Sequence, residues 1–158
     1  MKRTLMMLVP TVLSLTACGG GSADLVGSYT GMTTYTWERY SYTTTLQTTV
    51  DIFDSPDGNL EIVGTAREAN ARPSEPSLTC RIKGKPTSSG FEIEPGASCV
   101  LEGLRADCGA VTAAVVSASA VKTALGLTIS VRAQAQGCGT SQGDPEFVNL
   151  RASLTKSP

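Results

Sequence analysis

A long alternation of side-chain types between residues 40 and 52 is the feature that most constrains how this chain folds. Every second residue belongs to one series, which consists of Tyr40, Tyr42, Thr44, Leu46, Thr48, Val50 and Ile52. The residues between them are Ser, Thr, Gln or Asp. A period of two places the two series on opposite faces of an extended strand, and Thr, Tyr and Val favour that conformation. A Pro-Asp-Gly turn at 56–58 and a second alternating segment over 60–66 then predict a hairpin.

The same period recurs along the rest of the chain. Alternating segments cover 78–83, 91–94, 127–136 and 148–154, and turn-forming residues separate them. Segment 110–125 is rich in Ala and Val and is compatible with a short helix, but its Val, Ser and Thr content and the lack of a helix cap favour a strand. One apolar and one polar face per strand are typical of antiparallel strands around a single core. We therefore predict an all-β fold, an antiparallel meander of about eight or nine strands that closes into a small barrel, with a β-sandwich as the alternative.

The N-terminal residues predict export from the cytoplasm. Lys2 and Arg3 precede an apolar run from Leu5 to Leu15, which is the order of parts in a secretory signal. The run is shorter than the roughly 20 residues that a membrane-spanning helix needs, and Pro10 interrupts it. A cleaved signal is therefore favoured over a retained transmembrane helix.

The residues at the end of this run indicate a particular kind of signal peptide. An ordinary secretory signal peptide is the alternative. Leu15-Thr16-Ala17-Cys18 resembles the lipobox of bacterial lipoproteins, which signal peptidase II reads. The resemblance implies that Cys18 is lipidated and becomes the first residue of a protein anchored to a membrane of the cell envelope. Gly19 rather than Asp follows the cysteine, which in that family favours the outer membrane. The expected parts are a signal peptide (1–17), a lipidated flexible tether (18–24) and a single β-barrel-like domain (25–156).

Four cysteines remain after Cys18, namely Cys80, Cys99, Cys108 and Cys138. An even number of cysteines in an exported domain predicts two disulfides, for which three connectivities exist. A zinc site is disfavoured because the chain has no histidine and no Cys-x-x-Cys pair. Cys80 with Cys99 and Cys108 with Cys138 are the favoured pairs, because each pair brackets a neighbouring strand hairpin.

Composition and motifs argue against several classes of function. Charges of both signs are scattered along the chain, 13 Lys and Arg against 14 Asp and Glu, so nucleic-acid binding is disfavoured. Without histidine the commonest general base is missing. The sequence Gly139-Thr140-Ser141-Gln142-Gly143 has the letters of a nucleophile elbow but lacks the histidine partner, and Asp-Pro follows it. We predict a protein that is not an enzyme and that uses no cofactor or metal.

Two weaker resemblances concern the body of the chain. Gly27-Ser28-Tyr29 resembles the Gly-x-Trp opening of lipocalin-like barrels, with Tyr in the place of Trp. The stretch from Cys80 to Cys99, which ends in GFEIEPGASC, is similar to small Cys-containing envelope lipoproteins. The first resemblance implies a barrel that holds a small apolar ligand.

The aromatic residues are unevenly distributed, since all four Tyr and the single Trp lie between residues 29 and 42. Tyr and Trp are enriched at binding surfaces, and we expect Trp37 to be partly exposed. Packing in the core or at one barrel end is the alternative. The candidate binding residues are Tyr35, Trp37, Tyr40 and Tyr42. The resulting hypothesis is a lipid-anchored, non-catalytic module that binds a small apolar ligand, a protein or a glycan, with a structural or assembly subunit of an envelope complex as the alternative.

Overall fold

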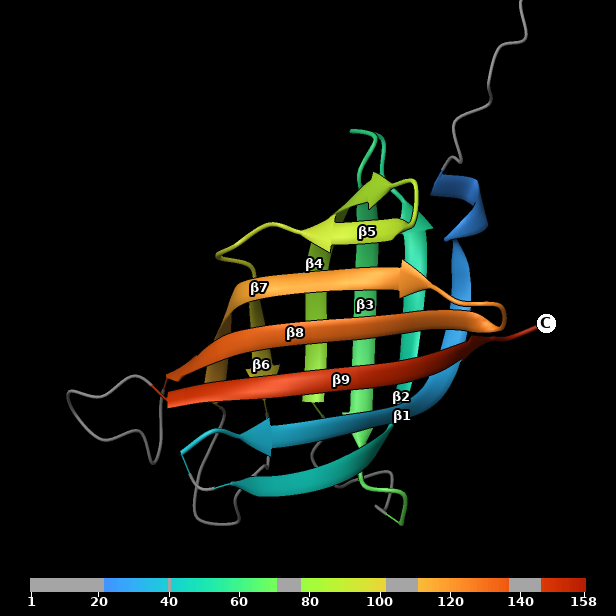
Figure 1. The fold of residues 1–158 in the computed structure, drawn as a ribbon. Coiled ribbons are helices and arrows are strands. Elements are labelled where there is room, and N and C mark those ends of the chain that lie inside the picture. Colours follow the sequence, from blue (N-terminus) through green and yellow to red (C-terminus); the bar gives the residue numbers. More distant parts are fainter. Residues whose placement is uncertain (1–21, 40, 71–77, 102–110, 137–145) are drawn as a thin grey trace, which may run out of the picture.

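The computed structural model describes residues 22–39, 41–70, 78–101, 111–136 and 146–158. Within these ranges the chain contains one short 3-10 helix, η1 (Ser22–Asp24), and nine strands (Figure 1). The strands are β1 (Gly27–Trp37), β2 (Tyr42–Asp54), β3 (Leu60–Arg67), β4 (Leu78–Thr87), β5 (Gly90–Ile93), β6 (Ser98–Leu101), β7 (Val111–Lys122), β8 (Gly126–Gln136) and β9 (Glu146–Lys156). Most of segment 110–125 forms the strand β7, which confirms the prediction of a strand over a helix.

The strands form a closed antiparallel barrel, as the sequence predicts, rather than a sandwich. Apart from β5 and β6, consecutive strands of the chain pair with each other, and β9 closes the barrel by pairing with β1 from Tyr29 opposite Lys156 to Trp37 opposite Val148. The short strands β5 and β6 follow one another in a single position, between β4 and β7. The meander therefore has eight positions around the barrel, one of which is divided.

The division between β5 and β6 has a local cause. Pro95 lacks an amide hydrogen, and Gly96 adopts a positive φ of 93°, so the chain leaves the sheet between these strands. The facing strand β7 has an irregularity in its pairing with β8 between Val115 and Ser117. The backbone hydrogen bonds of Val115 go to Gly96 and Ala97, so β7 remains attached to this connection.

The alternation predicted from sequence sorts the side chains between the barrel interior and its surface. Two clusters of buried side chains fill the interior. One contains Leu25, Tyr29, Val50, Ile52, Leu60, Ile62, Ile82, Phe91, Ile93, Val115, Ala120, Leu127, Ile129, Ala152 and Leu154. The other contains Tyr35, Trp37, Leu46, Ala66, Leu78, Ala113, Ala133, Ala135 and Val148.

The two ends of the barrel differ in their connections. The end at which β1 begins and β9 ends also holds the short turns 55–59, 88–89 and 123–125, and we call it the proximal end. The longer connections 68–77, 102–110 and 137–145 join strands at the opposite, distal end, together with 38–41. Figure 1 shows η1 and the C-terminus together at the proximal end. No helix in the described ranges is long and apolar enough to cross a membrane.

Candidate functional site

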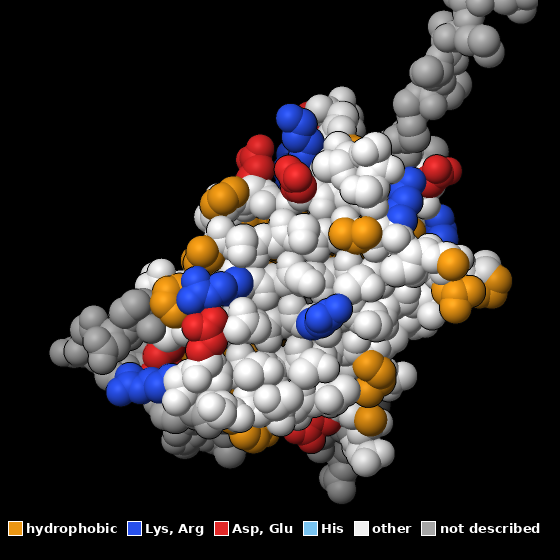
Figure 2. All heavy atoms as spheres, in the orientation of Figure 1, with side chains coloured by type: hydrophobic (Ala, Val, Ile, Leu, Met, Phe, Trp, Pro, Cys, Tyr) orange, Lys and Arg blue, Asp and Glu red, His pale blue; other side chains and the backbone are white. Residues whose placement is uncertain are grey.

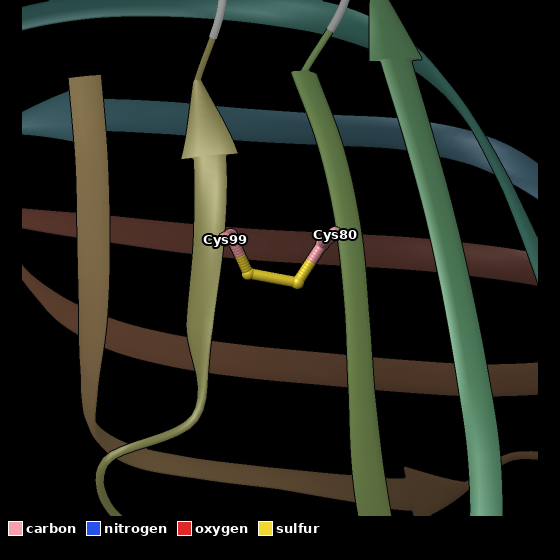
Figure 3. The surroundings of a disulfide bond; sticks show 2 residues. All are labelled: Cys80 and Cys99. Carbon is pink, nitrogen blue, oxygen red and sulfur yellow. A yellow bond between two sulfur atoms is a disulfide. The ribbon is translucent and has the colours of Figure 1, made fainter. Parts of the chain in front are cut away.

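The disulfide predicted between Cys80 and Cys99 is present (Figure 3). The two residues lie directly opposite each other on β4 and β6, with their Cα atoms 4.4 Å apart. The disulfide thus links β4 to the short strand β6, and these two strands share only three residue pairs. Cys18, Cys108 and Cys138 lie outside the described residues, as does the 139–143 motif.

The predicted aromatic patch is not a surface patch. Trp37 is only 7% exposed and Tyr35 only 1%, and their rings pack edge to face with centroids 5.8 Å apart. The expectation that Trp37 is partly exposed is therefore wrong. Strand β1 continues as far as Trp37, and a period of two from the buried Tyr29 places residues 35 and 37 inside the barrel. Tyr42, opposite Trp37 at the distal rim, is 55% exposed, and Tyr40 lies outside the described residues.

Two buried polar groups, the hydroxyl of Tyr35 and the carboxylate of Glu146, lie at the distal end of the interior. The hydroxyl of Tyr35 is buried and has no hydrogen-bond partner among the described residues. Burial raises the pKa of the Tyr35 phenol above its ordinary range, and the carboxylate of Glu146 raises it further. Glu146 is itself buried, with Arg39 Nη1 at 3.6 Å from its Oε1. The distal interior is consequently more polar than the alternating pattern predicts, because Glu146 precedes the alternating segment 148–154.

The interior also contains a cavity of about 90 Å³. Its lining is apolar except for a few threonines, of which Thr48 donates a hydrogen bond to the hydroxyl of Thr33 at 2.7 Å. Pockets that bind small organic molecules usually have about 300–1,000 Å³, and a dry cavity of about 150 Å³ accepts benzene. The cavity is therefore small for the type of ligand that a lipocalin-like barrel encloses.

A larger hollow lies on the outer wall formed by β7, β8 and β9. This outer groove has a volume of about 380 Å³. Its lining residues are Ser117, Ala118, Ser119, Ser130, Val131, Arg132, Asn149, Leu150 and Arg151. Strand register explains the hollow, because Ser119 lies opposite Ser130, which in turn lies opposite Arg151. Short serine side chains thus stand beside longer ones on adjacent strands, on a wall that Figure 2 shows as mostly uncharged with separate basic side chains.

The distal rim of the outer groove is fixed by an ion pair. Arg132 donates to both carboxylate oxygens of Glu38, from Nε at 2.8 Å and from Nη2 at 3.1 Å. Asn149 Nδ2 donates to the same carboxylate at 2.9 Å. These hydrogen bonds, from Arg132 above all, lower the pKa of Glu38. The guanidinium of Arg132 also lies 3.9 Å from the centre of the Phe147 ring, which holds it further.

Arg151 differs from Arg132 in having no acidic partner within the described part of the chain. It is exposed and forms no ion pair with any residue in those ranges. The outer groove therefore combines three serine hydroxyls with two guanidinium groups. That of Arg132 is held in an ion pair, and that of Arg151 has no acidic partner among the described residues. The alternation over 127–136 and 148–154 predicts that residues 130, 132, 149 and 151 lie on polar strand faces, but their adjacency depends on strand register, which a local pattern does not give.

A second surface hollow, of about 420 Å³, lies beside the connection between β5 and β6. Its basic side chains are engaged within the protein, since Arg81 pairs with Glu61 and Lys83 pairs with Asp57 at 2.7 Å. No group of three or more His, Cys, Asp or Glu suited to a metal ion occurs among the described residues. The outer groove is thus the better candidate for a ligand, because Arg151 forms no ion pair with a described residue, although Arg132 and Asn149 are bonded to Glu38.

Comparisons with known proteins assign no relative. No protein-family model matches the sequence, and no curated protein is significantly similar to it. A function for this chain therefore has to be inferred from its own residues.

Proposed function

We propose that this protein is a lipid-anchored, non-catalytic binding module of a bacterial cell envelope, and that its outer groove binds a polar ligand, namely a glycan. The observation that carries the proposal is the contrast between the two hollows. The barrel interior keeps only about 90 Å³ free, whereas the open outer groove offers about 380 Å³ lined by six polar and three apolar side chains.

The lining of the outer groove suits a carbohydrate. Serine hydroxyls donate and accept hydrogen bonds, and the Asn149 amide and the guanidinium groups add donors. The charge of Arg151 favours an acidic sugar, because guanidinium groups pair with carboxylates in a bidentate manner. Phe147 does not line the groove, but its ring lies against the guanidinium of Arg132 and helps to hold it at the rim.

Two observations support the location. Leu15-Thr16-Ala17-Cys18 resembles a lipobox, and Gly19 favours the outer membrane. The Cys80–Cys99 disulfide is typical of an oxidising compartment outside the cytoplasm. On this proposal, residues 1–17 are removed and acyl chains on Cys18 hold the domain at the membrane.

The causes of the pKa shifts of Glu38, Asp57 and Tyr35 support a non-catalytic role. The pKa values of Glu38 and Asp57 are lowered by hydrogen bonds in ion pairs, and that of Tyr35 is raised by burial. None of these three groups needs a catalytic role to explain its shift. The chain also has no histidine.

We propose a second disulfide between Cys108 and Cys138. Thr112 and Gln136 are opposite each other on β7 and β8, near the distal end of both strands. Cys108 lies four residues before Thr112, and Cys138 lies two residues after Gln136. The two cysteines thus belong to connections that leave adjacent strands at the same end.

Binding of oligosaccharides to the purified protein tests the function. We expect uronate-containing oligosaccharides to bind more tightly than neutral ones, and Arg151→Ala to weaken their binding about tenfold or more, since a charged hydrogen bond contributes about 1.5–3 kcal/mol. Arg81→Ala is the matched control, because Arg81 is an exposed arginine on another part of the wall and should leave binding unchanged.

Equal affinities of the wild type and Arg151→Ala would contradict the assignment of the groove. A protein that binds no oligosaccharide but copurifies with an envelope complex would instead favour the alternative of a structural or assembly subunit. If an apolar ligand binds tightly and Arg151→Ala does not change its affinity, the barrel interior would be favoured as the binding site.

A further inference from the structure

The segment that leads to Cys18 is fastened to the proximal end of the barrel. Of the expected tether 18–24, residues Ser22–Asp24 form η1. Leu25 follows in the core, and its carbonyl accepts a hydrogen bond of 2.8 Å from the Tyr29 hydroxyl. Two lysines hold Asp24, since Lys122 Nζ lies 3.4 Å from its carboxylate and Lys156 Nζ donates to its carbonyl at 3.1 Å.

The turn beside η1 carries the most exposed large hydrophobic residue among those described. Leu125 is 75% exposed and lies in the short turn between β7 and β8. Val121, near the end of β7, is half exposed. A hollow of about 210 Å³ separates η1 from this turn, and Leu125, Lys122 and Lys156 all line it. Asp24 lines the same hollow, and its contacts with Lys122 and Lys156 leave further N–H donors on each ammonium, which has three. An apolar side chain beside amines is a combination that the headgroup region of a bilayer accommodates, because lysines reach the phosphates while the apolar group enters the acyl boundary.

The length of the chain determines what can approach this turn. Three glycines separate Cys18 from Ser22, so the chain makes four residue steps and reaches at most about 14 Å. The 11 residues of β1 span about 35 Å, or about 27 Å along the axis of a barrel with a strand tilt of about 40°. Acyl chains on Cys18 can therefore bring the bilayer to the proximal end but not to the distal end.

We infer that the proximal end of the barrel lies on the lipid surface, with the turn at Leu125 inserted at the headgroup boundary. The inference rests on the proposed acylation of Cys18 and goes beyond it, because an anchor alone leaves the orientation of the barrel open. Val121, Lys122, Leu125 and Lys156 form the contact. The distal end then points away from the membrane, and the outer groove stands on the side wall where a glycan can reach it.

Tryptophan fluorescence of the membrane-extracted, full-length gene product in vesicles tests this orientation. The vesicles contain phosphatidylcholine and phosphatidylglycerol, with or without doxyl-labelled phosphatidylcholine as a quencher. Leu125→Trp places a reporter in the proposed contact, and Tyr42→Trp places a matched one at the exposed distal rim. Both variants retain Trp37, so the wild type gives the baseline, and both positions are exposed enough to tolerate the change.

We expect the added fluorescence of Leu125→Trp to shift to shorter wavelength and to be quenched by the doxyl lipid. The added fluorescence of Tyr42→Trp should do neither. Mass spectrometry of the same preparations reports acyl groups on Cys18, and Cys18→Ser should abolish both the acyl mass and vesicle binding.

The outcomes separate the anchor from the orientation. If the protein is acylated and vesicle-bound but the reporter in Leu125→Trp is quenched no more than the reporter in Tyr42→Trp, the orientation is overturned and the anchor stands. The same holds if Leu125 proves to be buried between two copies of the chain, which crosslinking on the vesicles would detect. Absence of acyl groups from Cys18 in the extracted protein would overturn the anchor and the orientation together.

Discussion

At the scale of single residues, Trp37 and Tyr42 show that two aromatic residues in register with each other can differ in exposure. They are opposite each other at the distal ends of β1 and β2. Trp37 is buried against Tyr35, whereas Tyr42 is 55% exposed. Their roles therefore differ, although composition alone grouped them as one aromatic cluster.

This difference predicts unequal effects on stability. Trp37→Ala should lower the free energy of unfolding by about 3–5 kcal/mol, because it leaves a cavity in the distal core cluster. Tyr42→Ala, the control, should change it by less than about 0.5 kcal/mol. Urea unfolding followed by circular dichroism measures both. Similar small losses for the two variants would mean that Trp37 does not pack as described.

At the scale of elements, the β2–β3 hairpin is held by its turn and by a residue from β4. The backbone amide of Asn59 donates to Asp57 Oδ1 at 3.1 Å, and Lys83 Nζ donates to Oδ2 at 2.7 Å. Gly58 adopts a positive φ of 80°, which the tight turn requires. The hydrogen bond from Lys83, with smaller contributions from Ser55 and Asn59, holds the pKa of Asp57 well below its ordinary range.

The lowered pKa of Asp57 predicts a pH dependence. Its carboxylate stabilises the folded state at pH values above the ordinary pKa of aspartate, and that contribution is lost as the pH falls towards the lower folded-state pKa. In acid titrations of stability, Asp57→Asn and Lys83→Met should both lose stability less steeply than the wild type over this range. The effect should be small, because the ion pair is solvent-exposed. An unchanged slope in both variants would show that the pair does not contribute.

At the scale of the whole molecule, the Cys80–Cys99 disulfide lies where the meander is least continuous. Strand β6 pairs with β4 over only three residues, and Cys80–Cys99 joins them there. The proposed Cys108–Cys138 link would join the connections that flank β7 and β8 at the distal end. Both links would limit separation of strands around the divided position of the barrel.

Peptide mapping under non-reducing conditions tests this arrangement. We expect Cys80 joined to Cys99, Cys108 joined to Cys138, and no free thiol at these four positions. A free thiol at Cys108 or Cys138 would contradict the second link. Any peptide that joins Cys80 or Cys99 to either of the other two would contradict the pairing seen in the structure.

The sequence by itself determined which side chains face the core. The alternation over 46–52, 60–66 and 127–135 predicted the inward residues of these strands, and hence the all-β antiparallel barrel, because the two-residue period of a strand is a local property. The sequence also favoured the Cys80–Cys99 bond, because the two cysteines bracket one strand hairpin, and the structure confirms this pair.

Only the tertiary structure decided how these strands meet. Closure of β9 on β1, the shared position of β5 and β6, and the full length of β1 that buries Trp37 all depend on pairing between segments distant in sequence. The outer groove depends on register across three strands, which brings Ser119, Ser130 and Arg151 into one row. Register is set by the shear of the closed barrel and by the irregularity in β7, and no local pattern in the chain encodes either of them.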